Sequence, residues 1–68
     1  EVYPFDIKTY SINKMGGSWS VSNKKIKILN QDDSKVTIEV VTGRSGQADI
    51  IYTVNGEEYI FPITIKSL

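Results

Sequence analysis

The chain has 68 residues, with eight Lys and Arg against eight Asp and Glu, and it contains neither Cys nor His. A chain of this length forms a single domain, so separate cofactor and substrate domains are excluded. Zero net charge argues against a nucleic-acid binder or a binder of anionic membranes, and without Cys or His there are no disulfides, thiol nucleophiles or imidazole bases.

The first strands are predicted within the first twelve residues, where the apolar pattern is irregular. Residues 2–4 are expected to form a short extra edge strand that is ended by a proline. Residues 6–12 form a longer strand. The apolar residues of this region fall into two opposite phases, Phe5 with Ile7 and Tyr10 with Ile12. We therefore expect a bulge or burial on both faces, followed by a flexible turn at residues 13–17.

Two short strands with alternating side chains come next. In residues 18–21, Trp19 and Val21 share one face. In residues 25–29 the isoleucines face the core and the lysines face water, with Ile26 and Ile28 inward and Lys25 and Lys27 outward. Residues 30–34 form a cluster of Asn, Gln, Asp and Ser, which predicts a polar turn.

The C-terminal half carries the most regular alternation. Residues 35–41 and residues 48–54 both place an apolar side chain at every second position, which indicates strands with one buried face. The segment between them, residues 42–47, contains two glycines and is expected to be a loop.

A hairpin is predicted at the end of the chain. Asn55-Gly56 lies between two alternating runs, which is the strongest short signal for a type I′ turn. The last strand extends to residue 66, with Tyr59, Phe61, Ile63 and Ile65 on one face and Ile60 as an apolar residue out of phase. Pro62 cannot donate a hydrogen bond, so this strand is expected at an edge or with a bulge.

Six or seven short strands separated by turns predict an all-β sandwich or barrel. No segment is apolar enough to span a bilayer and no signal peptide is visible. The chain opens on Glu1, and we expect it to be a fragment or processed piece of a longer protein. The predicted core consists of Ile7, Ile12, Trp19, Val21, Ile26, Ile28, Val36, Ile38, Val40, Ile50, Tyr52, Val54, Phe61, Ile63 and Ile65.

Three segments carry a resemblance to a known family. G-S-W-S-V-S-N at residues 17–23 resembles a segment of bacterial Ig-like domains of group 2, and V-T-I-E-V at 36–40 and G-Q-A-D-I-I-Y at 46–52 follow in that family's order. The opening residues 2–5 and the close at 61–68 look like Ig-like modules of virion proteins of phages that infect Gram-positive bacteria. The resemblance implies an Ig-like β-sandwich of six to seven short antiparallel strands, with residues 1–68 as a single domain.

The resemblance also implies a function and a location. The domain would be the C-terminal, non-enzymatic structural or display module of a phage capsid or tail protein, located in the virion and weakly attached to host cell-surface glycans. The alternative is an adhesion or carbohydrate-binding accessory domain of a bacterial secreted or surface protein, located outside the cell or on its surface. The expected partners are the parent protein and a cell-surface polysaccharide, with no nucleic acid, no membrane insertion and no cofactor.

Candidate glycan contacts are the tyrosines that the strand pattern leaves unplaced and the basic run. These residues are Tyr3, Tyr10, Tyr59, Lys25 and Lys27. An edge strand guarded by lysines is the plainer explanation of the basic run, which also includes Lys24. Trp19 and Tyr52 are in phase with aliphatic neighbours and are expected in the core.

No catalytic or metal-binding residues are predicted. Asp32 and Asp33, together with Asp6 or Asp49, lack the spacing of a Ca²⁺ loop, and a solvated turn explains the adjacent pair. Glu57 and Glu58 would need a cleft to act as a glycosidase pair, and a solvated hairpin explains them. The alternating serines have no histidine or cysteine beside them, so they are expected to form the outer face of a strand; they are Ser18, Ser20 and Ser22.

Overall fold

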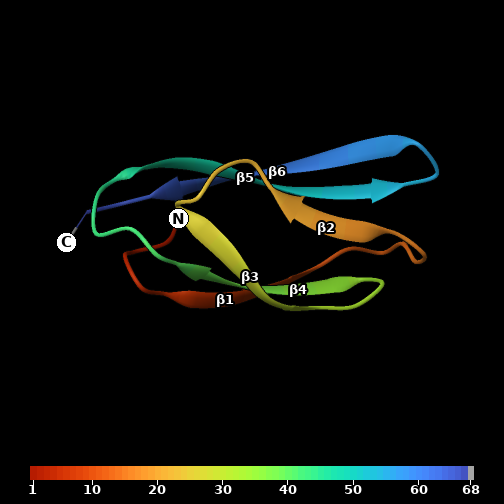
Figure 1. The fold of residues 1–68 in the computed structure, drawn as a ribbon, viewed down its shortest axis with the longest axis horizontal. Coiled ribbons are helices and arrows are strands. Elements are labelled where there is room, and N and C mark those ends of the chain that lie inside the picture. The colour runs from red at the N-terminus through yellow and green to blue at the C-terminus, as the bar shows by residue number, and fades with distance from the viewer. Residues whose placement is uncertain (68) are drawn as a thin grey trace.

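The computed structural model describes residues 1–67 and contains six strands and no helix within that range. The strands are β1 (Ile7–Ser11), β2 (Ser18–Val21), β3 (Ile26–Gln31), β4 (Lys35–Val40), β5 (Gly46–Val54) and β6 (Glu57–Ile65). They form two three-stranded antiparallel sheets, ordered β1-β4-β3 and β2-β5-β6, which lie as two layers in Figure 1. The all-β prediction is confirmed, and Leu68, the end of the expected C-terminal match, lies outside the described residues.

The β5–β6 hairpin has the predicted turn. Asn55 and Gly56 both have positive φ, at 53° and 77°, as a type I′ turn requires. The two-residue turn makes Val54 and Glu57 a hydrogen-bonded pair, and hydrogen-bonded pairs then alternate along the hairpin. Pro62 lies opposite Asp49 in a pair that exchanges no ladder hydrogen bond. The proline therefore removes no bond to β5, and β6 is an edge strand as predicted.

The β3–β4 connection is tighter than the polar cluster indicates. The predicted turn at residues 30–34 is wrong in its first half, because Asn30 and Gln31 continue β3 and pair with β4. A register shift between Ile28 and Asn30 lets the strand continue past Leu29, which is left exposed. The turn closes on Asp32, whose Oδ1 accepts hydrogen bonds from two following backbone N–H groups.

The irregular phase of the first strand comes from a bulge at Phe5 and Asp6. The Phe5 N–H donates to the Val40 carbonyl at 2.9 Å, and the Val40 N–H donates to the Asp6 carbonyl at 2.9 Å. Phe5 and Asp6 therefore both lie opposite Val40, which is the arrangement of a β-bulge. Phe5 takes the left-handed φ of 66° that a glycine usually supplies in this bulge. The bulge leaves Ile7 on the outer face and 59% exposed, so its predicted place in the core is wrong.

The core lies between the two sheets and is centred on Trp19 and Tyr52. Both are buried, as predicted, and their ring centroids lie 4.8 Å apart at an interplanar angle of 58°. Buried aliphatic side chains from both sheets surround this pair, and the other predicted core residues are buried or pack against the buried set.

Val2 is a buried residue that the predicted core does not contain. Instead of an extra edge strand, residues 2–4 give a single parallel bridge between Val2 and Ile65. The Val2 N–H donates to the Thr64 carbonyl at 3.0 Å, and the Lys66 N–H donates to the Val2 carbonyl at 2.8 Å. These two hydrogen bonds hold Val2 against the end of β6, where the residue is almost completely buried.

Candidate functional site

The structure places the three predicted tyrosines in different environments. Tyr10 on β1 and Tyr59 on β6 are half-buried and pack against the core from opposite sheets, whereas Tyr3 is 45% exposed. Val2 pairs with Ile65, six residues beyond Tyr59 along β6, which separates Tyr3 from Tyr59 by about 20 Å. The tyrosines therefore do not lie together as one stacking platform.

Two of the tyrosines already interact with charged neighbours. The Lys14 Nζ lies 4.8 Å from the centroid of the Tyr59 ring, in cation–π geometry. Burial and the Asp6 carboxylate raise the pKa of the Tyr10 phenol, so this hydroxyl stays protonated at neutral pH. Tyr10 and Tyr59 therefore already make contacts within the domain, and Tyr3 has the most accessible surface of the three tyrosines.

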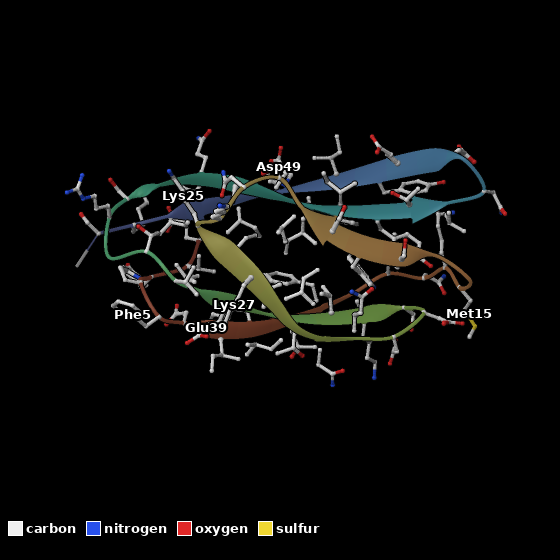
Figure 2. All side chains as sticks on the ribbon, in the orientation of Figure 1. Phe5, Met15, Lys25, Lys27, Glu39 and Asp49 are labelled. Carbon is white, nitrogen blue, oxygen red and sulfur yellow. The ribbon has the colours of Figure 1, made fainter. Side chains whose placement is uncertain are left out.

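The two predicted lysines lie on β3 or just before it, at the edge of a sheet. Lys27 forms an ion pair with Glu39 at 3.6 Å across the outer face of β3 and β4 (Figure 2). The stem of Lys25 lies against Gly46, since a Cβ there would come within 2.8 Å of the Lys25 Cε. This arrangement agrees with lysines that guard an exposed edge.

A polar hollow of about 120 Å³ lies where β1, β4 and the end of β3 meet. Thr9 on β1 and Thr37 on β4 face each other across the pair, and their Oγ1 atoms are 3.0 Å apart. Asn30 pairs with Thr37 from the other side, which extends this polar row across the sheet. The hollow is lined by Thr9, Asn30, Gln31, Asp32, Lys35 and Thr37.

The electrostatics of the hollow are set by Asp32. The backbone N–H groups of Ser34 and Lys35 hydrogen-bond to its carboxylate and, together with the Lys35 charge, lower its pKa below the ordinary value. The carboxylate therefore stays ionised at neutral pH. Carboxylate, amide, hydroxyl and ammonium groups line one shallow surface and can donate to and accept from a ligand rich in hydroxyl groups.

The hollow has no signature in the sequence because the residues that line it come from distant parts of the chain. Thr9 and Thr37 become neighbours only through the register of β1 on β4. Asn30 joins them only because β3 extends past its bulge. The sequence predicts only that Thr37 points outward, because it alternates with the inward-facing residues of its strand.

The other residues weighed as chemical candidates are the aspartates, the alternating serines and the two glutamates of the last hairpin. Residues 1–67 contain no group of three or more carboxylates placed to hold a metal ion. The Ser22 hydroxyl accepts a hydrogen bond from the Asp49 N–H at 2.8 Å, which holds the end of β2 on β5. Glu57 and Glu58 are exposed beside the hairpin turn.

Comparisons with protein-family models, with curated proteins and with solved structures find no match to this chain. Within residues 1–67, no helix has the length and apolar character needed to cross a membrane.

Proposed function

We propose that the chain is a non-enzymatic Ig-like module that serves a larger assembly as a structural or display unit. The observation that carries the proposal is the order of the strands. Constant-type immunoglobulin sandwiches place strands A, B, E and D in one sheet and C, F and G in the other. If β1 to β6 correspond to B to G, the observed orders β1-β4-β3 and β2-β5-β6 become B-E-D and C-F-G.

The core supports the same assignment. Immunoglobulin domains bury a tryptophan on strand C, and Trp19 is buried on β2, the strand that would correspond to C. Its partner in register is Tyr52 on β5, the strand that corresponds to F. The Ig-like resemblance of residues 17–23 and 46–52 falls on these two strands.

A display role is supported by the placement of the chain ends. Val2 and Ile65 pair directly, so the described ends lie together at one end of an elongated domain of 37 × 18 × 17 Å. The β5–β6 turn and the Met15 loop lie at the other end of the long axis (Figures 1 and 2). A tether at the chain ends would therefore hold that far end outward. Together with the resemblance, this favours a module of a phage virion protein.

Weak attachment to a cell-surface polysaccharide is the second part of the proposal. The polar hollow around Thr9 and Thr37 supplies the mixed donors and acceptors that sugar hydroxyls need. The same hollow favours the alternative role, a carbohydrate-binding accessory domain of a bacterial surface protein.

The test is a titration of the ¹⁵N-labelled chain with purified cell-wall polysaccharide from Gram-positive bacteria. Attachment through the hollow would shift the amides of Thr9, Asn30 and Thr37. Attachment through the sequence-predicted residues would shift Tyr3, Lys25 and Lys27 instead. A dispersed β spectrum without shifts would leave the display role alone. Release of reducing ends from the polysaccharide during the titration would contradict a non-enzymatic module.

A further inference from the structure

The polar hollow continues into a second row of side chains on the outer face of the β1-β4-β3 sheet. The hollow row crosses the sheet at Thr37, which pairs with a residue of β1 on one side and of β3 on the other. Two residues further along β4, Glu39 pairs with Ile7 and with Lys27 in the same way. Side chains two residues apart share one face of a strand, so this ion-pair row lies beside the hollow row, about 7 Å away.

Acid and base are paired in both parts of this face. Asp32 and Lys35 line the hollow together, and in the ion-pair row Lys27 and Glu39 lie 3.6 Å apart (Figure 2). The hydrogen bonds that the Asp32 carboxylate accepts from the backbone keep it ionised, so it repels a phosphate or carboxylate group of a ligand. Each cation that could attract such a group already has an acid beside it. The charges therefore favour a ligand that carries none.

The uncharged groups of the face suit a chain of sugars. The bond between the Thr9 and Thr37 hydroxyls uses only one of their protons, so this pair can still donate to and accept from a ligand. Ile7 is 59% exposed in the ion-pair row and offers an apolar contact beside these polar groups. A sugar ring presents hydroxyl groups at its rim and C–H groups on its faces, which matches this combination.

We propose that this face binds an uncharged polysaccharide whose sugar units lie along the strands, over the hollow row and the ion-pair row. This ligand class, which rests on the proposed attachment to a cell-surface polysaccharide, sets aside anionic polymers, whose phosphate or uronate groups would meet Asp32 and Glu39. Because the contacts are hydrogen bonds and apolar contacts on an open surface, binding should be weak and should depend little on salt.

The test divides purified cell-wall polysaccharide from Gram-positive bacteria into uncharged and anionic fractions by anion exchange. The ¹⁵N-labelled chain is titrated with each fraction at equal sugar concentration. The uncharged fraction should shift the amides of both rows, with Thr37 reporting on the hollow row and Ile7 and Glu39 on the ion-pair row. Its Kd should change by less than about twofold between about 50 mM and about 500 mM NaCl, because no net charge is involved.

Thr37→Val removes one hydroxyl from the hollow row and keeps a β-branched side chain that suits a strand. It should weaken binding of the uncharged fraction by about two- to tenfold. Thr53→Val is the matched control, because Thr53 is half-buried like Thr37 and lies on β5, the central strand of the other sheet. Thr9→Val, at an exposed position, repeats the test if the spectrum of Thr37→Val is not that of a folded domain.

Equal affinities of Thr37→Val, or of Thr9→Val where it replaces it, and of Thr53→Val would overturn the proposed site. Shifts confined to the hollow row would overturn its extension over the ion-pair row. Shifts caused by the anionic fraction alone, and lost as salt is raised, would overturn the uncharged ligand and leave attachment to a polysaccharide in place. No shift with either fraction would contradict attachment itself, and the ligand class with it.

Discussion

The hydroxyl of Tyr52 donates a hydrogen bond to the Asp33 carbonyl at 2.6 Å, and so links the middle of one sheet to the β3–β4 turn of the other. The same oxygen accepts a hydrogen bond from the Gly17 N–H at 3.0 Å. One phenol in the core therefore fixes both the turn after β3 and the entry into β2. Sequence position alone predicted the burial of this ring and not the role of its hydroxyl.

Tyr52→Phe tests that link. It keeps the ring packing against Trp19 and leaves the Gly17 N–H and the Asp33 carbonyl without their partner, so it should lower the free energy of unfolding by about 1–3 kcal/mol. Urea denaturation measures the loss. Tyr59→Phe is the control, because the described residues give that hydroxyl no hydrogen bond, and it should change stability by less than about 0.5 kcal/mol. Equal effects of the two variants would show that the link contributes nothing.

Gly17→Ala should be strongly destabilising for a steric reason. A Cβ at this position would clash with the Tyr52 Cζ and lie 2.6 Å from the Thr53 carbonyl oxygen. Relief of these contacts requires the ring or the backbone to move, which typically costs about 1–3 kcal/mol. Gly43→Ala is the matched control, since a Cβ there meets nothing within 4 Å. It should be neutral or stabilising by up to about 1 kcal/mol in the same thermal melts, and a similar loss for both variants would count against the steric account.

Phe5→Gly is expected to leave the domain as stable as before or slightly more stable. Phe5 holds a φ of 66° and is 64% exposed, so the ring contributes little burial at a strained position. Removing the strain of the left-handed conformation should stabilise the folded state by about 1–2 kcal/mol. Glycine also raises the conformational entropy of the unfolded chain, which offsets about 0.5–1 kcal/mol of that stabilisation.

The control for this variant is Ile7→Gly, which places glycine at the first residue of β1 and should destabilise the domain. A loss of more than about 1 kcal/mol in Phe5→Gly would show that the exposed ring packs more tightly than its exposed area indicates. Chemical denaturation of both variants under one set of conditions distinguishes the two results.

The pH dependence of stability should carry the signature of Asp32. Its pKa is lowered in the folded state by the backbone N–H groups of Ser34 and Lys35, so its contribution is present above the unfolded pKa of about 3.9. That contribution is lost as the pH falls through the lower folded pKa. Asp32→Asn should flatten this part of the curve of unfolding free energy against pH. If the free energy of unfolding of Asp32→Asn fell at low pH as it does in the unmodified chain, Asp32 would not be the source of this pH dependence.

Trp19→Ala should unfold the domain. Loss of the buried indole costs about 3–5 kcal/mol, and a core in a chain this small supplies a total of about 3–5 kcal/mol. Trp19→Phe should retain a folded state, because it keeps an aromatic ring and removes the indole Nε1, a buried side-chain atom for which residues 1–67 provide no hydrogen-bond partner. A well-dispersed spectrum of the alanine variant would show that Trp19 is not the centre of the core.

The strands that sequence alone predicted well are those whose pattern is decided locally. Residues 35–40 and the Asn55-Gly56 turn follow a period of two and a preference for positive φ, and neither depends on a distant partner. The position of Pro62 on an edge strand follows in the same way from the missing N–H.

The failures occur where a partner far along the chain decides the outcome. Ile7 is exposed because the bulge at Phe5 forms against Val40, and the turn signals around Phe5 do not reveal that partner. Val2 is buried because it bridges to Ile65 at the opposite end of the sequence. The hollow depends on the register of Thr9 on Thr37, which no local pattern contains.

The order of the strands is the central claim, and cross-strand nuclear Overhauser effects test it most directly. Thr9 with Thr37 and Trp19 with Tyr52 are pairs without mutual ladder bonds, in which the two Cα atoms come closest, at about 4.5 Å. The observed orders β1-β4-β3 and β2-β5-β6 predict strong Hα–Hα contacts in both pairs and none between β1 and β2. Strong contacts between β1 and β2, as in a simple meander of consecutive strands, would contradict the account.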